Sequence, residues 1–155
     1  MDIKFEVDNY RFTVRSSCII KDKEHEKVII SNMRGITDHE AFILPGGRPN
    51  LLEDTKQAIK REIEEELQLE LDFKLVSVEE NFVESTKFHM IEFVYYAEIE
   101  SFDSIVIPDD GWDKFKIVEI KDIDNVDVRP KTIRNLIKSE SYSNITHNIN
   151  YDWAD

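Results

Sequence analysis

Residues 44–69 read LPGGRPNLLEDTKQAIKREIEEELQL, and the spacing of their apolar residues predicts an amphipathic helix. At about 100° per residue, Ile59, Ile63 and Leu67 form a single apolar stripe on a helix over 54–67. A stripe of this kind is buried against a sheet or another helix in a folded protein. We therefore expect this helix to pack on the core.

The two ends of this helix carry separate signals. Asp54 or Thr55 can accept hydrogen bonds from the unpaired N–H groups of the first turn. Before them, Gly46 and Gly47 permit backbone angles closed to other residues. We therefore expect a tight connection between a strand at 41–44 and the helix.

The same helix also carries three glutamates on one face. Glu62, Glu65 and Glu66 lie within an arc of roughly 100°, next to the apolar stripe. Like charges three or four residues apart repel by a few tenths of a kcal/mol, roughly, so the helix gains nothing locally from them. They form either a solvated acidic face or a site for an oxygen-preferring cation such as Mg²⁺ or Mn²⁺. Arg61, four residues before Glu65, can pair with it and fix its rotamer.

The rest of the chain is rich in strand patterns. A second helix is predicted over 130–139, with Pro130 suited to its first turn because proline lacks an N–H group. Alternating or short apolar runs predict strands at 3–7, 10–20, 27–31, 41–44, 73–82, 88–99 and 115–120. The order of these elements favours an α+β fold, an αβα sandwich with a mixed sheet.

Length and charge limit the possible architecture and partners. The 155 residues contain no linker-like or repetitive segment, so we expect a single domain over 1–155 with a polar C-terminal tail at about 140–155. The tail is expected to be a loose end, or else a strap across a neighbouring surface. A formal net charge of −13 argues against a nucleic-acid polymer as partner, but small phosphorylated ligands remain compatible if a metal ion reverses the local field.

Cysteine content and the N-terminus indicate the compartment. Cys18 is the one cysteine, and it lies in an apolar run, so we expect a buried thiol in a reducing environment. Residues 1–7 alternate polar and apolar side chains, unlike a signal peptide, and no apolar run is long enough to span a membrane. We expect a cytoplasmic protein without a membrane partner.

One longer pattern joins the glycines to the glutamates and resembles a known signature. The positions of that signature that require a particular residue type match at Gly47, Glu53, Arg61, Glu62, Ile63, Glu65, Glu66 and Leu69. The exception is its second glycine, where this chain has Gln68. The pattern resembles the Nudix box of hydrolases that act on a nucleoside diphosphate linked to another group. The preceding Leu-Pro-Gly-Gly and the flanking strands also look like this family and its αβα sandwich.

The resemblance implies roles for particular side chains. Glu62, Glu65 and Glu66 would hold Mg²⁺ or Mn²⁺, Glu53 would assist electrostatically or through a water molecule, and Arg61 would orient a ligand carboxylate. Glycine at position 68 would permit a left-handed helix end, and glutamine costs on the order of 1 kcal/mol in that conformation. We therefore expect a slightly altered helix exit.

The general base and the substrate contacts are less determined. Glu65 or Glu53 is the first choice as base, and the alternatives outside the motif are Glu80, Glu92, Asp113 and Glu119. Phosphate contacts are predicted from Gly46, Gly47, Arg34 and Arg48, with Lys21 and Lys87 as further cations. The strand aromatics, which either stack on a base or belong to the core, are Phe82, Phe88, Phe93, Tyr95 and Tyr96.

These observations predict a metal-dependent hydrolase that cleaves a phosphoanhydride bond in a small nucleotide. A catalytically inactive nucleotide sensor of the same fold is the main alternative, and a purely structural acidic domain is another. Four correctly spaced glutamates favour the enzyme because a sensor does not need them. Homodimers are the commonest assembly of soluble oligomers, so a homodimer is the expected assembly if chains associate.

Overall fold

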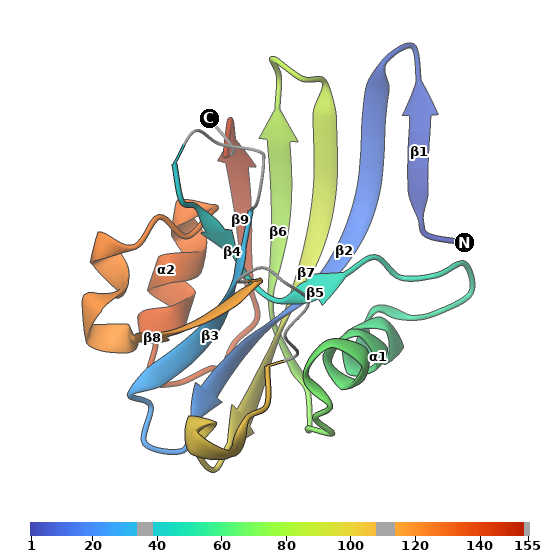
Figure 1. Cartoon of the computed structure of the whole chain (residues 1–155). Coiled ribbons are helices and arrows are strands. Elements are labelled where there is room, and N and C mark those ends of the chain that lie inside the picture. Colours follow the sequence, from blue (N-terminus) through green and yellow to red (C-terminus); the bar gives the residue numbers. More distant parts are fainter. Residues whose placement is uncertain (34–38, 108–113, 154–155) are drawn as a thin grey trace.

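The computed structural model describes residues 1–33, 39–107 and 114–153, and a mixed β-sheet dominates it (Figure 1). The helices are α1 (Thr55–Leu67) and α2 (Lys131–Lys138), with 3₁₀ turns η1 (Phe102–Ser104) and η2 (Ile120–Asn125). The strands are β1 (Lys4–Val7), β2 (Tyr10–Asp22), β3 (Lys27–Asn32), β4 (Phe42–Ile43), β5 (Gly46–Gly47), β6 (Lys74–Val83), β7 (Phe88–Ile99), β8 (Phe115–Glu119) and β9 (Thr146–Tyr151). Each of the seven predicted strand runs contains a strand.

The strands run in the order β4-β3-β2-β7-β6-β9, with β1 and β5 added to β2 and β8 added to β3. The pairs β2–β7 and β6–β9 are parallel, and the other strand pairs are antiparallel. The expected mixed sheet is therefore confirmed. The long β2–β7 pair forms its centre and pairs residue by residue from Arg11 with Phe88 to Asp22 with Ile99.

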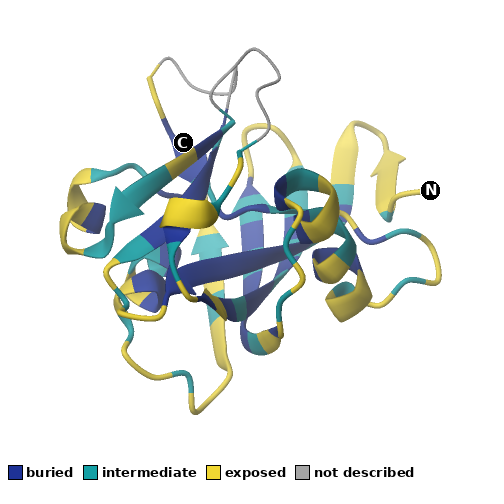
Figure 2. Cartoon of the chain, turned by 60° about the horizontal axis from the view of Figure 1, so that its bottom comes forward, coloured by how far each residue is buried: buried dark blue, intermediate teal, exposed yellow. Residues whose placement is uncertain are grey.

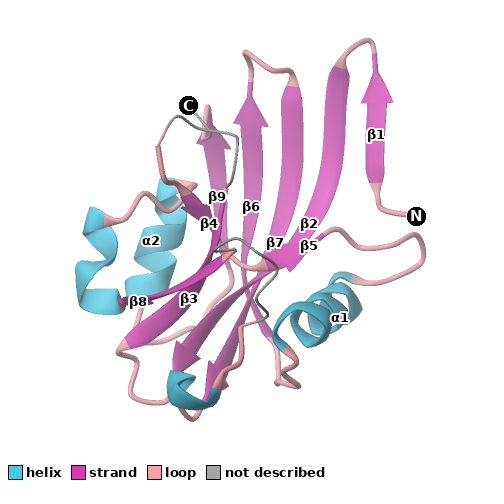
Figure 3. Cartoon of the chain, in the orientation of Figure 1, coloured by secondary structure: helices cyan, strands magenta, loops and turns pink. Residues whose placement is uncertain are grey.

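Each face of the sheet has its own apolar core, and each core includes one of the two helices (Figure 3). Ile19 and Ile20 are adjacent on β2, fully buried, and belong to different cores because successive side chains of a strand point to opposite faces. Ile20 packs in the core of α1, whereas Ile19 packs with Ile133 and Ile137 of α2. The αβα sandwich predicted from the sequence is confirmed.

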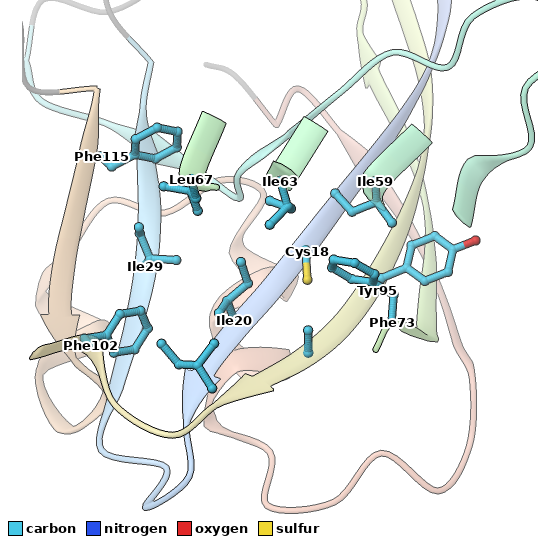
Figure 4. Packing of buried hydrophobic residues seen from close by; sticks show 12 residues of the cluster. Cys18, Ile20, Ile29, Ile59, Ile63, Leu67, Phe73, Tyr95, Phe102 and Phe115 are labelled. Atoms are coloured by element: carbon cyan, nitrogen blue, oxygen red, sulfur yellow. The ribbon is translucent and has the colours of Figure 1, made fainter. Parts of the chain in front are cut away.

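The predicted stripe of α1 is the buried face of that helix. Ile59, Ile63 and Leu67 point from the helix toward the strands, with exposures of at most 2% (Figure 4). Each contributes roughly 2 kcal/mol by leaving water. Cys18 lies in the same core, so the expected buried thiol is confirmed, and burial raises its pKa well above the ordinary value.

The start of α1 is closed by a capping box. The Asp54 carboxylate accepts a hydrogen bond from the Gln57 N–H at 2.8 Å, and the Gln57 side chain accepts one from the Asp54 N–H at 3.1 Å. These reciprocal bonds satisfy N–H groups that the helix cannot pair, a contribution of about 1 kcal/mol. Asp54, of the two predicted candidates, is therefore the cap.

The end of α1 corrects the expectation of an altered helix exit. Gln68 adopts the left-handed conformation, with φ 57° and ψ 36°, and its N–H donates to the Glu64 carbonyl at 3.0 Å. This is the geometry that glycine would provide. The chain thus makes the same turn with glutamine, at a steric cost on the order of 1 kcal/mol.

Of the two forms expected for the C-terminal tail, the structure has the ordered one and not the loose end. Residues 146–151 form β9, which pairs in parallel with β6 from Ser77–Thr146 to Phe82–Tyr151. Asn150 donates a hydrogen bond from Nδ2 to Asn81 Oδ1 at 2.9 Å, and Asn81 is fully buried. The tail is thus an edge strand of the sheet.

Burial follows the layers of the sandwich. Figure 2 shows buried residues concentrated in the central strands, whereas β1 and the connecting turns are exposed. Within the described ranges, no helix combines the length and the apolar character needed to cross a membrane.

Candidate active site

The two glycines of β5 bring the chain close to both β2 and α1. Gly46 and Gly47 pair with Ser17 and Ser16 of β2. A Cβ atom on Gly46 would overlap the Ser16 carbonyl oxygen, and one on Gly47 would overlap the carboxyl group of Glu62. The predicted tight connection is confirmed, and Gly47 leaves the space that the Glu62 carboxylate occupies.

Arg61 holds two glutamates together beside this turn. Its guanidinium donates to Glu53 from Nη2 at 2.9 Å and from Nε at 3.1 Å, and to Glu62 Oε1 from Nη1 at 2.8 Å. The Nη2 group also donates to the Arg48 carbonyl at 3.2 Å. The hydrogen bond from Arg61 is the main reason that the pKa of Glu53 is lowered, and hydrogen bonding to Glu53 raises the pKa of Arg61.

The partners of Arg61 differ in part from those predicted by helical spacing. Glu65 lies 3.6 Å from Arg61 and is 61% exposed, so this contact is the weakest of the three. Glu53 and Glu62 are the close partners because the loop before α1 brings Glu53 alongside the helix. The geometry places Arg61 where it can orient the Glu62 carboxylate.

Glu66, the third acidic residue of the arc, pairs with a lysine from a distant segment. Lys114 Nζ lies 2.7 Å from Glu66 Oε1, and the two side chains are 32% and 19% exposed. Lys114 was not predicted from the sequence. It lies 48 residues from Glu66 along the chain, and no local spacing rule links such positions.

The three carboxylates suit a divalent cation in chemistry, but their side chains do not converge on one point. All three donors are oxygens, which Mg²⁺ and Mn²⁺ prefer, and they share one face of α1 beside the space left by Gly47. Their side chains turn instead toward Arg61 and Lys114, and the described residues contain no convergent group of three or more acidic, histidine or cysteine ligands. Each carboxylate pairs with a nearby cation of the protein, which offsets the repulsion among the three.

The remaining predicted residues are scattered. Arg34 and Asp113 lie outside the described residues. The Arg48 side chain is 44% exposed near the loop and lies 4.0 Å from Asp2. Lys21 does not reach the glutamates: it is 1% exposed and donates to the Ser139 carbonyl at 2.8 Å, beyond the end of α2. Lys87 lies at the β6–β7 turn and lines a different cavity.

The candidate bases outside the motif either contact other residues or lie in other parts of the fold. Glu80 lies 2.6 Å from His147, and Glu119 immediately precedes η2. Glu92 is 3% exposed and lies 3.4 Å from Arg15, which also donates to the Leu44 carbonyl at 2.8 Å. Arg15 thereby anchors the segment that leads into Gly46, a role not predicted from its position in the sequence. Its one available signal was a charged residue within a predicted strand.

Comparison with known proteins agrees with this geometry. The NUDIX domain model matches residues 11–138. The fold resembles the MutT protein from Methanosarcina mazei Go1, with a TM-score of 0.64 and 16% identity over 86% of this chain and 94% of the other. It also resembles a NUDIX hydrolase from Nitrosomonas europaea, with a TM-score of 0.63 and 18% identity over 81% of this chain and 86% of the other.

A third similar structure is a NUDIX-family hydrolase from Clostridium perfringens, with a TM-score of 0.60 and 17% identity over 84% of this chain and 93% of the other. No curated protein matches the sequence. The family model spans most of the chain and includes the turn, α1 and both layers of the sandwich. The chain is therefore a member of the Nudix hydrolase family.

Proposed function

We propose that this protein hydrolyses a phosphoanhydride bond in a small nucleotide, such as a nucleoside triphosphate or another compound in which a nucleoside diphosphate is linked to a second group. The observation that supports this most directly is the joint placement of Glu53 and Glu62 by Arg61 beside Gly47. Such preorganisation lets a site stabilise charge without rearranging during the reaction. A solvated acidic face does not require it.

The proposed metal ligands are Glu62, Glu65 and Glu66, and the proposed ion is Mg²⁺ or Mn²⁺. When bound, the ion would lower the pKa of a water molecule and neutralise the phosphate oxygens. Arg61 keeps one oxygen of Glu62 in position, and Gly47 leaves the carboxyl group its space. Lys114 contacts one oxygen of Glu66 and offsets part of its charge, so the carboxylate would hold the ion more strongly without this lysine.

In the proposed reaction, the water oxygen attacks phosphorus, the bridging P–O bond breaks and the water proton passes to a base. Both oxygens of Glu53 already accept hydrogen bonds from Arg61, and one also accepts from Asn50 at 3.2 Å. Its carboxylate is therefore committed to positioning. Glu65 is 61% exposed with only a long contact to Arg61, so it can turn toward a water molecule and is the proposed base.

The test is product release from nucleoside triphosphates, nucleotide sugars, ADP-ribose and dinucleoside polyphosphates, each with Mg²⁺, Mn²⁺ or chelator. Glu65→Gln and Glu66→Gln should each lower the metal-dependent rate more than about tenfold while the protein stays folded. Glu64→Gln, an exposed neighbour on the same helix, is the matched control and should retain activity. Full activity in both site variants would reject the proposed mechanism.

A nucleotide sensor would give a different result in the same experiment. It would bind nucleotide and gain thermal stability without product release under any metal condition. A homodimer and a cytoplasmic location are further expectations from the sequence, and light scattering on the purified chain tests the first.

A further inference from the structure

An aromatic surface continues beyond α1 on the same side of the sheet. The strand registers bring Phe12 of β2, His89 of β7, Phe82 of β6 and Tyr151 of β9 into one row. Phe82 stacks on His89 with 4.4 Å between ring centroids and on Tyr151 with 5.3 Å, and the ring planes differ by 24° and 21°. Four adjacent strands therefore present a continuous row of rings, in the part of the sheet that α1 leaves uncovered (Figure 1).

This row forms part of a cavity of about 590 Å³. Phe5 and Tyr10, from the β1–β2 hairpin, also line it and are 63% and 60% exposed, and Tyr151 is 75% exposed. Scattered apolar residues are normal on a protein surface, but several large rings gathered around one cavity indicate a binding surface. The volume lies within the range of roughly 300–1,000 Å³ typical of small-ligand sites.

The charges around the cavity indicate what kind of ligand it accepts. Arg11 and Lys87 line it together with one acid, Glu84. Arg11 lies over the Phe88 ring at 5.3 Å and Lys87 over the Tyr10 ring at 4.8 Å. Neither cation forms an ion pair with any residue in the described ranges. In a chain of net charge −13, this surface favours an anion.

We propose that this cavity binds a planar aromatic ring that carries a phosphate, with a nucleoside monophosphate as the representative ligand. The rings supply stacking surfaces for a base, and Arg11 and Lys87 donate hydrogen bonds to the phosphate oxygens. No lining residue comes from α1 or from the Gly46–Asp54 segment. The site is therefore separate from the glutamates and does not depend on metal or on turnover.

The experiment is a calorimetric titration of the full chain with AMP in the presence of chelator. Tyr151→Ala and Lys87→Gln should each weaken binding about fivefold or more, and adenosine should bind more weakly than AMP. Lys23→Gln, at an exposed lysine outside the cavity, controls for the change in net charge. Glu62→Gln and Glu66→Gln should leave AMP binding unchanged. Melting curves verify that each variant folds.

Four results would overturn the inference. The first is the absence of binding at millimolar AMP. The second is binding lost in Glu62→Gln but kept in Tyr151→Ala, which would locate the ligand at the glutamates and leave the proposed hydrolase intact. The third is competition by inorganic phosphate as strong as by AMP, which would remove the role of the rings. The fourth is concentration-dependent dimerisation that Tyr151→Ala abolishes without any AMP binding, which would make this face a self-association surface.

Discussion

The Nζ atom of Lys114 lies 2.7 Å from a carboxylate oxygen of Glu66, so the ammonium group and a divalent ion compete for the same ligand. Replacing the lysine removes that competitor. Lys114→Met should therefore bind Mn²⁺ about fivefold more tightly, corresponding to roughly 1 kcal/mol for a partly exposed ion pair. Paramagnetic resonance or calorimetry without substrate measures this. The control is Lys116→Met, which removes the same charge from a β8 side chain that is 52% exposed. Unchanged or weaker Mn²⁺ binding in Lys114→Met would contradict the competition.

The left-handed conformation of Gln68 makes a stabilising substitution available. Gln68→Gly should raise the free energy of unfolding by about 0.5–1 kcal/mol, because glycine adopts φ 57° without steric cost. Urea denaturation measures the change. Gln57→Gly serves as the contrasting variant and should be destabilised, since it loses the capping box and places glycine inside the helix. A destabilised Gln68→Gly protein would show that the side chain itself holds the helix end.

Lys21 gives the stability a pH dependence of predictable sign. Burial lowers the pKa of its amine to about 8 in the folded protein, whereas the unfolded chain keeps the proton up to about pH 10.4. The unfolded state binds more protons between these values, so the contribution of Lys21 becomes more favourable as pH rises. Relative to Lys21→Met, the wild type should gain about 1–2 kcal/mol between about pH 7.5 and about pH 9.5.

Wild type and Lys21→Met both contain Cys18 and the tyrosines. The titration of these groups therefore cancels when the unfolding free energies of the two proteins are compared at the same pH. Urea denaturation at several pH values measures the difference in unfolding free energy between the two proteins. The exposed Lys23→Met variant should show no such trend. A constant difference between wild type and Lys21→Met would mean that the buried amine keeps its ordinary pKa.

The hydrogen bond between the terminal strand and β6 predicts a cost for Asn150→Ala. This change leaves the side-chain oxygen of the fully buried Asn81 without its partner. The Thr132 hydroxyl loses its acceptor on Asn150 at 3.2 Å but keeps Glu79 at 2.9 Å. The expected loss is about 1–3 kcal/mol of unfolding free energy. Ile149→Ala, at a neighbouring side chain that is 55% exposed, should lose less than about 0.5 kcal/mol. Equal effects in the two variants would argue against an ordered β9.

Local periodicity accounts for what the sequence predicted well. Ile59, Ile63 and Leu67 define the buried face of α1 by their spacing alone, and alternating residues reveal most strands. β9 was missed because its sequence is largely polar and its partner, β6, lies about 70 residues earlier. β5 was missed because two glycines carry no side-chain pattern.

The candidate site was predictable to a similar extent. The positions of the glutamates on one helical face follow from sequence spacing. The Arg61–Glu65 contact also follows from the spacing, but two other ion pairs do not. Glu53 approaches Arg61 through the path of a loop, and Lys114 approaches Glu66 from a distant segment just before β8. The row of rings from Phe12 to Tyr151 likewise requires the register of four strands, which no single segment encodes.

The position of β2 has a consequence for insertions and deletions. This strand supplies adjacent residues, Ile19 and Ile20, to opposite cores and also pairs with the glycines of β5. One residue added near its middle would exchange the two faces and displace Gly47 from Glu62 at the same time. Length changes within β2 should therefore disrupt both cores and the glycine turn together.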